Sequence, residues 1–584
     1  MTGTRVVTDP VVFEVFKNTL SGLADEMAIT ILRTAHSQIV AESMDYSAAL
    51  CDADGNVVAQ ANTIPVHLGS IPEAMAAVLR AFGGDLGDGD VYILNDPDDG
   101  GMHLPDVFAV MPVFALGELA GFAVCVANHA DIGGWAPGSM SVQSTTIFAE
   151  GLQLPPTRLV AAGRLDDGIL RIILRNVREP ELFRGDLESQ LAACTTGAAG
   201  IRRLAAQHGL AGYRVLCHEL LDYSDARLRT ALAEATPGSY EFEDHLDDDG
   251  LTDKPVTLKV KATLSGSGLR FDFTGTSPQV GSALNATASF TKSACYAAVQ
   301  AAIGGDVPPN SGMYRAMSFV IPEASILQGR RPAARGARGL TGHRLLDVAL
   351  GVLAQIFPGR IPAGGDGGPN SLAVGVIDGD GTSRVVWDVM CGSWGARADK
   401  DGIDGASSLG ANLANTPIEE LERSGLVRIE GYGLLPDTGG PGRFRGGLST
   451  FRDVLLLEET ALLQVRSDRR RFPSYGLDGG LPGAPSLNLL TTPDGEQTLL
   501  ATKPSLTIGG GTRHRHITAG GGGYGDPYTR DPDLVLRDVI AEKVSVAGAA
   551  RDYGVVVTPD GPAIDMPATA ALRANRHTDR KEIR

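Results

Sequence analysis

The chain lacks the features that attach a protein to a membrane or to nucleic acid. Its 584 residues contain no run of about 18 apolar residues, and the opening MTGTRVVTDPVVFEVF has no apolar segment typical of a secretory signal. Acidic residues outnumber basic ones by 69 to 51, which gives a formal net charge of −18 and leaves no massed basic surface for phosphates. We therefore expect a cytoplasmic protein with no membrane and no nucleic-acid partner.

Cysteine is also scarce. The six cysteines are scattered without a C-x-x-C pair, which favours reduced thiols in the core over a disulfide framework. Glycine and proline, by contrast, are abundant at 74 and 33 residues and show no collagen period. They predict many turns and glycine-rich loops, some of which bring backbone amides close to a ligand.

Length and patterning predict several domains, since 584 residues exceed the size of a single core. Helical spacing covers 10–36 and much of 170–222, whereas apolar and polar residues alternate from 238 onward. The prediction is a multi-domain α+β fold with mixed and antiparallel sheets, packed helices and glycine-rich loops. We expect an N-terminal α+β domain at 1–236, a central α+β domain at 237–425, a β-rich domain at 426–560 and a frayed tail at 561–584. A short helix is expected at 534–549.

The stretch from 95 to 144 contains two pairs of candidate metal-binding residues. His103 and Asp106 form an H-x-x-D pair, and His129 and Asp131 form an H-x-D pair, both set among glycines and prolines that indicate tight turns. The apolar segments 107–114 and 119–127 between them predict a hairpin closed at 116–118, which would bring the two pairs to one end.

Two imidazoles and a carboxylate side by side are typical ligands of a divalent transition metal with an open position. Taken alone, such a pair is more often an Asp that stabilises a turn beside a solvated His, and only the two pairs together on one hairpin make the metal site an equal alternative. Asp45, at the head of a predicted strand, reads from its position as a cap. His67 lies in a predicted loop and faces either a site or solvent.

Other polar segments point to anion binding. Arg335-Gly336-Ala337-Arg338 precedes a predicted helix and can cradle an anion, although it lacks the lysine and glycine spacing of a P-loop. Gly520–Gly523 suits either a phosphate-binding nest or a plain turn. Arg469–Arg471 suits either an anionic substrate group or pairing with the acidic surface.

Many blocks in one order resemble the hydantoinase B/oxoprolinase family over nearly the whole chain. They include DPVVFEVFKNTL, MDYSAALCDADGNVVAQ, IPVHLGSIPEA, NDPDDGGMHLPDV, HADIGGWAPGSM, FTGTSPQVGSALNA, GSWGARADKDGIDG, NTPIEELE, GPGRFRGG and GGGGYGDP. The likeness is strongest to the B subunits of ATP-dependent N-methylhydantoinases and lactamases. Acetone and acetophenone carboxylase subunits and the C-terminal half of 5-oxoprolinase are related to the same family.

The resemblance implies the metal-binding subunit of an enzyme that hydrolyses C–N bonds in cyclic amides such as hydantoins, lactams or 5-oxoproline. A hydantoinase A-type partner would bind ATP and Mg, in a heterotetramer or larger complex that is active only when assembled. Carried over to this chain, a divalent metal (Zn, Mn, Fe or Co) would be held by Asp45, His103, Asp106 and His129. Asp131 would orient an imidazole, and His67 would act as a general acid or contact the substrate.

One departure concerns the metal set. Many relatives resembling this chain have two adjacent histidines where it has Asn128 and His129. We assign His129 because imidazole is the better ligand for a transition metal, with Asn128 binding through oxygen as the alternative. Two other functions stay open: a subunit of an ATP-dependent ketone carboxylase, and a non-catalytic scaffold whose metal motif has decayed.

Overall fold

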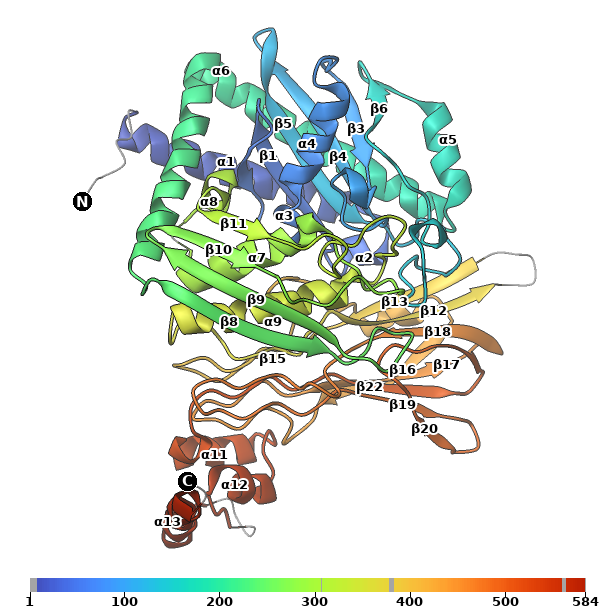
Figure 1. The fold of residues 1–584 in the computed structure, drawn as a ribbon. Helices are drawn as coiled ribbons and strands as arrows, with labels where there is room; N and C mark the ends of the chain where they lie inside the picture. Colours follow the sequence, from blue (N-terminus) through green and yellow to red (C-terminus); the bar gives the residue numbers. More distant parts are fainter. Residues whose placement is uncertain (1–7, 306, 378–382, 559–562, 583–584) are drawn as a thin grey trace.

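The structure is a computed structural model that describes residues 8–305, 307–377, 383–558 and 563–582. It is a multi-domain α+β fold in which helices pack against several sheets, as predicted (Figure 1). The sheets are antiparallel apart from one parallel pair. No helix among the described residues is both long and apolar enough to cross a bilayer. All six cysteines are buried and free, as predicted.

A seven-stranded sheet forms the N-terminal part, in the order β2-β1-β5-β4-β3-β6-β7. Its strands are β1 (Tyr46–Asp52), β2 (Val57–Gln60), β3 (Val91–Leu94), β4 (Asp106–Ala115), β5 (Glu118–Asn128), β6 (Thr157–Ala161) and β7 (Arg164–Leu165). The long helices α1 (Pro10–Thr34) and α6 (Pro180–Ala233) cover one face, and α4 (Ile71–Phe82) lies against the other. The same part holds the short helices α2 (Gln38–Ala41), α3 (Pro65–Leu68) and α5 (Asp167–Asn176).

The predicted hairpin is confirmed in β4 and β5. Leu116 and Gly117 close it with φ angles of 54° and 85°, the left-handed pair that suits a two-residue hairpin turn. At the open end, Asp106 pairs directly with Asn128 across the two strands. This register fixes which side chains share a face at the site.

The central part wraps a four-stranded sheet around two buried helices. The sheet runs β11-β10-β9-β8, and β10 and β11 are the parallel pair. Its strands are β8 (Gly238–Leu246), β9 (Val256–Ser265), β10 (Gly268–Asp272) and β11 (Met317–Val320), and its helices are α7 (Ala288–Ile303), α8 (Ser311–Tyr314) and α9 (Arg338–Ile356). Helix α9 is buried on nearly every side and lies at the middle of the molecule (Figure 1).

Three further sheets make up the rest. One has the order β13-β12-β18-β21, a second has the order β16-β17-β22-β19-β20, and a two-stranded ribbon joins β14 to β15. Their strands are β12 (Asn370–Ile377), β13 (Ser383–Met390), β14 (Gly392–Ser393), β15 (Asp404–Ala406), β16 (Val427–Leu434), β17 (Thr450–Leu456), β18 (Thr460–Arg466), β19 (Leu487–Thr491), β20 (Gln497–Leu499), β21 (Ser505–Gly509) and β22 (Arg513–Ile517), with α10 (Ile418–Glu422) between them. Strands from both sides of residue 425 share the first of these sheets, and our domain limits stay a prediction.

The C-terminal end differs from its prediction. Two helices, α11 (Pro532–Ile540) and α12 (Val546–Tyr553), replace the single expected helix, because Glu542 adopts a φ of 56° and Ser545 caps the second helix. The expected frayed tail contains helix α13 (Met566–Glu582). It is anchored because Thr569 Oγ1 accepts a hydrogen bond from Val556 N at 3.0 Å and Arg573 donates to the Tyr553 carbonyl at 3.1 Å.

Candidate active site

Three neighbouring strand ends bring polar side chains to one edge of the N-terminal sheet. Asp45 directly precedes β1, Asp106 begins β4 and Asn128 ends β5. The Asn128 backbone N–H donates to the Asp45 carbonyl at 3.0 Å, and its side-chain amide donates to Asp45 Oδ2 at 2.9 Å. Because Asn128 is also the cross-strand partner of Asp106, all three side chains lie on the same face.

Two histidines complete this group. His67, on α3, places Nε2 3.6 Å from Asp45 Oδ1 and 3.9 Å from Asp106 Oδ1. His103, in the turn before β4, places Nδ1 2.7 Å from Asp106 Oδ2. All four of these side chains are buried. The structure therefore brings together four of the six residues that we predicted: Asp45, His67, His103 and Asp106.

The other two predicted residues lie elsewhere, and this corrects our expectation. His129 faces α6, where its Nε2 is 3.0 Å from Gln190 Oε1 and its ring centroid is 4.1 Å from that of Phe183, with the two rings tilted by 32°. The reason is strand alternation, which sends His129 to the opposite face from Asn128. Asp131 fixes a turn, accepting bonds from Gly133 N at 2.8 Å and from the Arg178 guanidinium at 2.8 Å. It orients none of the imidazoles at the site.

Two guanidinium groups from distant parts of the chain enter the same site. Arg338, in the first turn of α9, donates to Asp106 Oδ2 and lies 4.2 Å from the Phe290 ring centroid. Arg466, at the end of β18, donates through Nε to Ser371 Oγ at 2.9 Å and forms no ion pair within the described residues. From the sequence, Arg338 was expected only as part of an anion cradle, and no local pattern marked Arg466.

These groups surround a small cavity of about 60 Å³. Its polar lining includes Asp45, His67, His103, Asn128, Arg338 and Arg466, and its apolar lining includes Val66, Phe290, Trp387 and Leu413. His343 of α9 also faces it and is held by Ser408 Oγ, 2.6 Å from its Nδ1. The cavity lies where all three parts of the chain meet.

Burial determines the protonation states of the acidic and histidine side chains at the cavity. It raises the pKa of Asp45 to about 7, with a further rise from Asp106, and it lowers the pKa of His67 and of His103 to about 4. Burial also acts to raise the pKa of Asp106, but His103 and Arg338 outweigh it and hold that pKa well below its usual value. At neutral pH the imidazoles are therefore uncharged, Asp106 is ionised, and Asp45 is poised to gain or lose a proton.

The residues present do not fit the four-ligand metal site that the family resemblance implies. No three His, Cys, Asp or Glu side chains in the described part of the chain converge at metal-ligand spacing. Oδ2 of Asp106 accepts a hydrogen bond from Arg338 and has His103 Nδ1 2.7 Å away, and the residue facing Asp45 is Asn128 rather than an imidazole. Asp106 Oδ1 and Asn128 Oδ1 have no hydrogen-bond partner among the described residues, which leaves them for another ligand.

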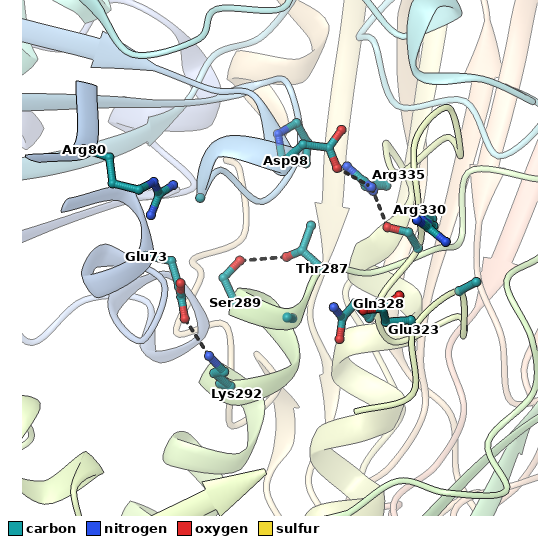
Figure 2. Close-up of a pocket in the computed structure, with 15 residues that line it drawn as sticks. Glu73, Arg80, Asp98, Thr287, Ser289, Lys292, Glu323, Gln328, Arg330 and Arg335 are labelled. Carbon is teal, nitrogen blue, oxygen red and sulfur yellow. Dashed lines mark hydrogen bonds and ion pairs between the residues drawn. The ribbon is translucent and has the colours of Figure 1, made fainter. Parts of the chain in front are cut away.

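A larger hollow of about 380 Å³ lies between α4, the turn η1 (Pro97–Asp99) and the start of α7 (Figure 2). It contains none of the residues predicted to bind a metal or to act in catalysis, although Arg335 of the predicted anion cradle lines it. Four of its charged side chains pair with one another, Glu73 with Lys292 at 2.6 Å and Asp98 with Arg335 at 2.8 Å. Glu150 holds the neighbouring loop by accepting from Arg335 N at 2.8 Å. The segment from Arg335 to Arg338 thus separates the outer hollow from the inner cavity.

Comparison with known proteins matches the hydantoinase B/oxoprolinase family over residues 9–527. The chain belongs to this family. Its members with similar sequences include caprolactamase subunit beta of Pseudomonas jessenii, which is 31% identical over 587 residues, covering 97% of this chain and 99% of that one. The 5-oxoprolinase of Saccharomyces cerevisiae is 30% identical over 553 residues, which are 90% of this chain and 42% of that longer protein.

Solved structures agree with the family. The crystal structure of the ATP-dependent caprolactamase from Pseudomonas jessenii superposes with a TM-score of 0.90 at 30% identity, covering 97% of this chain and all of that one. A nucleotide-free acetone carboxylase superposes with a TM-score of 0.91, covering 99% of this chain and 84% of that one, but at 20% identity this likeness shows the fold alone. The family fold is thus shared along the whole of this chain.

Proposed function

We propose that this chain is the substrate-binding subunit of an ATP-dependent hydrolase of small cyclic amides, acting with a hydantoinase A-type subunit that binds ATP and Mg. One observation carries the proposal: in a member of this family, one small cavity is lined both by a carboxyl group whose pKa burial raises to about 7 and by a guanidinium that is held by Asp106. Names of relatives such as caprolactamase subunit beta support both the reaction and the need for a partner.

Cavity size supports a small substrate. The volume of about 60 Å³ is the space open to the centres of water molecules, and it holds about four or five waters. The same number of waters occupies roughly 120–150 Å³ in the liquid. A ring of five to seven atoms displaces a similar volume. The polar groups also suit an amide, since Asn128 Oδ1 can accept its N–H while Arg338 and Arg466 can donate to its carbonyl oxygen.

The chemistry assigned to the chain follows from these groups. An amide resists attack because resonance removes positive character from its carbonyl carbon, and phosphorylation of the carbonyl oxygen by ATP restores that character. Arg338 and Arg466, which both line the cavity, would stabilise the negative charge of the phosphoryl group on the activated oxygen. Asp45, ionised near neutral pH, would take a proton from the attacking water. ADP would leave after the phosphorylation. The ring C–N bond would then break as the ring nitrogen takes the proton held by Asp45, and a second water would hydrolyse the resulting acyl phosphate to phosphate and the ring-opened carboxylate.

His67 would position the water. Its Nε2 lies 3.6 Å from Asp45 Oδ1, too far for a direct hydrogen bond, which leaves Nε2 free to bond to a water beside Asp45. The imidazole is neutral because burial lowers its pKa to about 4, so it can accept or donate without a change of charge. Asp131 has no part in this mechanism because its carboxylate is bound within its own turn.

The test is an assay of the assembled complex. The chain is co-expressed with a hydantoinase A-type protein, the stoichiometry of the complex is measured by sedimentation, and ADP release is followed with hydantoins, lactams and 5-oxoproline. We expect ring-dependent ADP release from the complex, none from the chain alone, and at least a hundredfold loss in Asp45→Asn. ADP release with ketones and bicarbonate instead would favour the carboxylase alternative, and a complex that is unaffected by Asp45→Asn would favour the scaffold alternative.

A further inference from the structure

We propose that the guanidinium of Arg338 occupies the position and supplies the charge of the divalent cation that the family resemblance implies, so that this centre binds its substrate carbonyl without a metal ion. The side chain reaches Asp106 from the first turn of α9, is 5% exposed and packs over the Phe290 ring. A guanidinium keeps its proton under all ordinary conditions, so the positive charge is permanent.

Charge balance supports this assignment. The cavity contains two carboxyl groups, Asp45 and Asp106, and two guanidinium groups, Arg338 and Arg466. With both carboxyls ionised the four side chains sum to zero, whereas two carboxylates without the arginines would need a dication. A dication added beside the arginines would leave two uncompensated positive charges in a buried space, which is strongly unfavourable.

Ligand geometry supports it as well. A cation at Asp106 would have to displace Arg338 and His103 from Oδ2 or lie on Oδ1 beside the fixed guanidinium. At the neighbouring position, Asn128 donates its amide to Asp45 Oδ2 and thereby uses the oxygen that a cation would share. The two residues act together: Asn128 offers no imidazole on the ligand face, and Arg338 places a positive charge beside Asp106.

The guanidinium differs from a metal in the ligand that it selects. It offers flat N–H donors, which bind carbonyl and phosphoryl oxygens by hydrogen bonds and do not lower the pKa of a bound water as a metal does. The nucleophilic water must then be activated by a carboxylate, and Asp45 is available for this because it lies 3.6 Å from His67 Nε2 and forms no ion pair with Arg338. The inference concerns the centre for any carbonyl substrate and does not depend on which ring is opened.

Metal content tests the inference without any substrate. The full chain, alone and with its partner, is dialysed against Zn²⁺, Mn²⁺, Fe²⁺ or Co²⁺ in turn, freed of excess ion and analysed by inductively coupled plasma mass spectrometry. We expect the wild-type chain to retain less than about 0.1 equivalent of any of them. A full equivalent that is lost in Asp106→Asn would overturn the proposal, whatever the outcome of the hydrolase assay.

A double variant provides the converse experiment. Arg338→Leu combined with Asn128→His removes the guanidinium and places an imidazole beside Asp45, His103 and Asp106. We expect this variant to retain about one equivalent of Zn²⁺ and to show visible absorption bands with Co²⁺. Arg338→Lys, which keeps the charge, is the matched control and should stay free of metal. A folded double variant that binds no metal would contradict the claim that these two residues exclude the ion.

Discussion

Arg338 and Asp106 lie 232 positions apart in the chain and form an ion pair from which solvent is excluded on both sides. Asp106 is fully buried, and the Arg338 side chain is 6% exposed. The pair joins the start of the central helix to the open end of the N-terminal hairpin. It therefore links two parts of the fold and sets the charge of the cavity between them.

Loss of Arg338 should destabilise the protein strongly. Arg338→Leu leaves the Asp106 carboxylate buried without its cation, and breaking one side of such a pair lowers the free energy of unfolding by about 3–5 kcal/mol. Arg338→Leu with Asp106→Asn removes both charges and should recover most of that loss. Urea unfolding measures all three proteins. Arg202→Leu is the control, because Arg202 and Asp88 form an exposed pair at 2.9 Å that contributes less than about 1 kcal/mol.

The pH dependence of stability should report the Asp45 carboxyl group. Burial and Asp106 raise its pKa from 3.8 to about 7, so the folded state binds this proton more tightly than the unfolded state. The contribution of this proton to the free energy of unfolding is fully present below about pH 4 and is lost as the pH rises through about 7. Asp45→Asn stays neutral, so at pH 8 it should exceed the wild type in free energy of unfolding by about 2–4 kcal/mol, and by little at pH 4.

The exposed Asp88 provides the control for that comparison. Asp88→Asn should change the free energy of unfolding by the same small amount at pH 4 and at pH 8, because its side chain is 63% exposed. An Asp45→Asn variant that loses stability as the pH rises from 4 to 8, relative to the wild type, would show that Asp45 is held ionised in the fold.

Catalytic activity should rise over the pH range in which stability falls, because ionisation of the Asp45 carboxyl group favours catalysis and disfavours folding. A general base works only when ionised, so kcat/KM for the cyclic amide should rise with pH and level off above about 7. The two imidazoles do not cause this rise of kcat/KM with pH, because burial lowers the pKa of His67 and of His103 to about 4. Ring-dependent ADP release measured from pH 5 to 9 gives the profile, and a flat profile would exclude Asp45 as the base.

The neighbours Asn128 and His129 should respond differently to alanine. Asn128→Ala removes the amide that holds Asp45 Oδ2, and we expect kcat to fall tenfold or more with a modest loss of stability. His129→Ala leaves Gln190 Oε1 without its partner beneath α6 and should lower the free energy of unfolding by about 1–3 kcal/mol, with kcat retained. Urea unfolding and steady-state kinetics are measured on both variants. A large loss of kcat in His129→Ala, with kcat retained in Asn128→Ala, would place His129 at the site.

Local signals predicted much of the fold. Helical spacing found α1 and α6, and two apolar runs around Leu116-Gly117 found the β4–β5 hairpin with its polar open end. Both depend on residues that are close in sequence. The sheet that joins β12 and β13 to β18 and β21 depends on pairing between segments that are far apart in the sequence. No local sequence pattern predicts such pairing.

The site was predicted only in part, for the same reason. The H-x-x-D spacing predicted His103 and Asp106, and the family resemblance added Asp45. His129 was preferred to Asn128 on ligand chemistry, although strand alternation already sent it to the other face. Arg338 and Arg466 reach the cavity through tertiary packing across more than 200 residues, which composition and periodicity do not reveal.

Location of the bound ring tests the account most directly. A crystal structure of the complex with a cyclic amide and a non-hydrolysable ATP analogue would show where the ring lies. We predict density in the inner cavity, with the carbonyl oxygen within hydrogen-bonding distance of Arg338 and the scissile carbon facing Asp45 and His67. A ring bound instead in the outer hollow beside Arg80 and Lys292, with the inner cavity filled only by water, would contradict it.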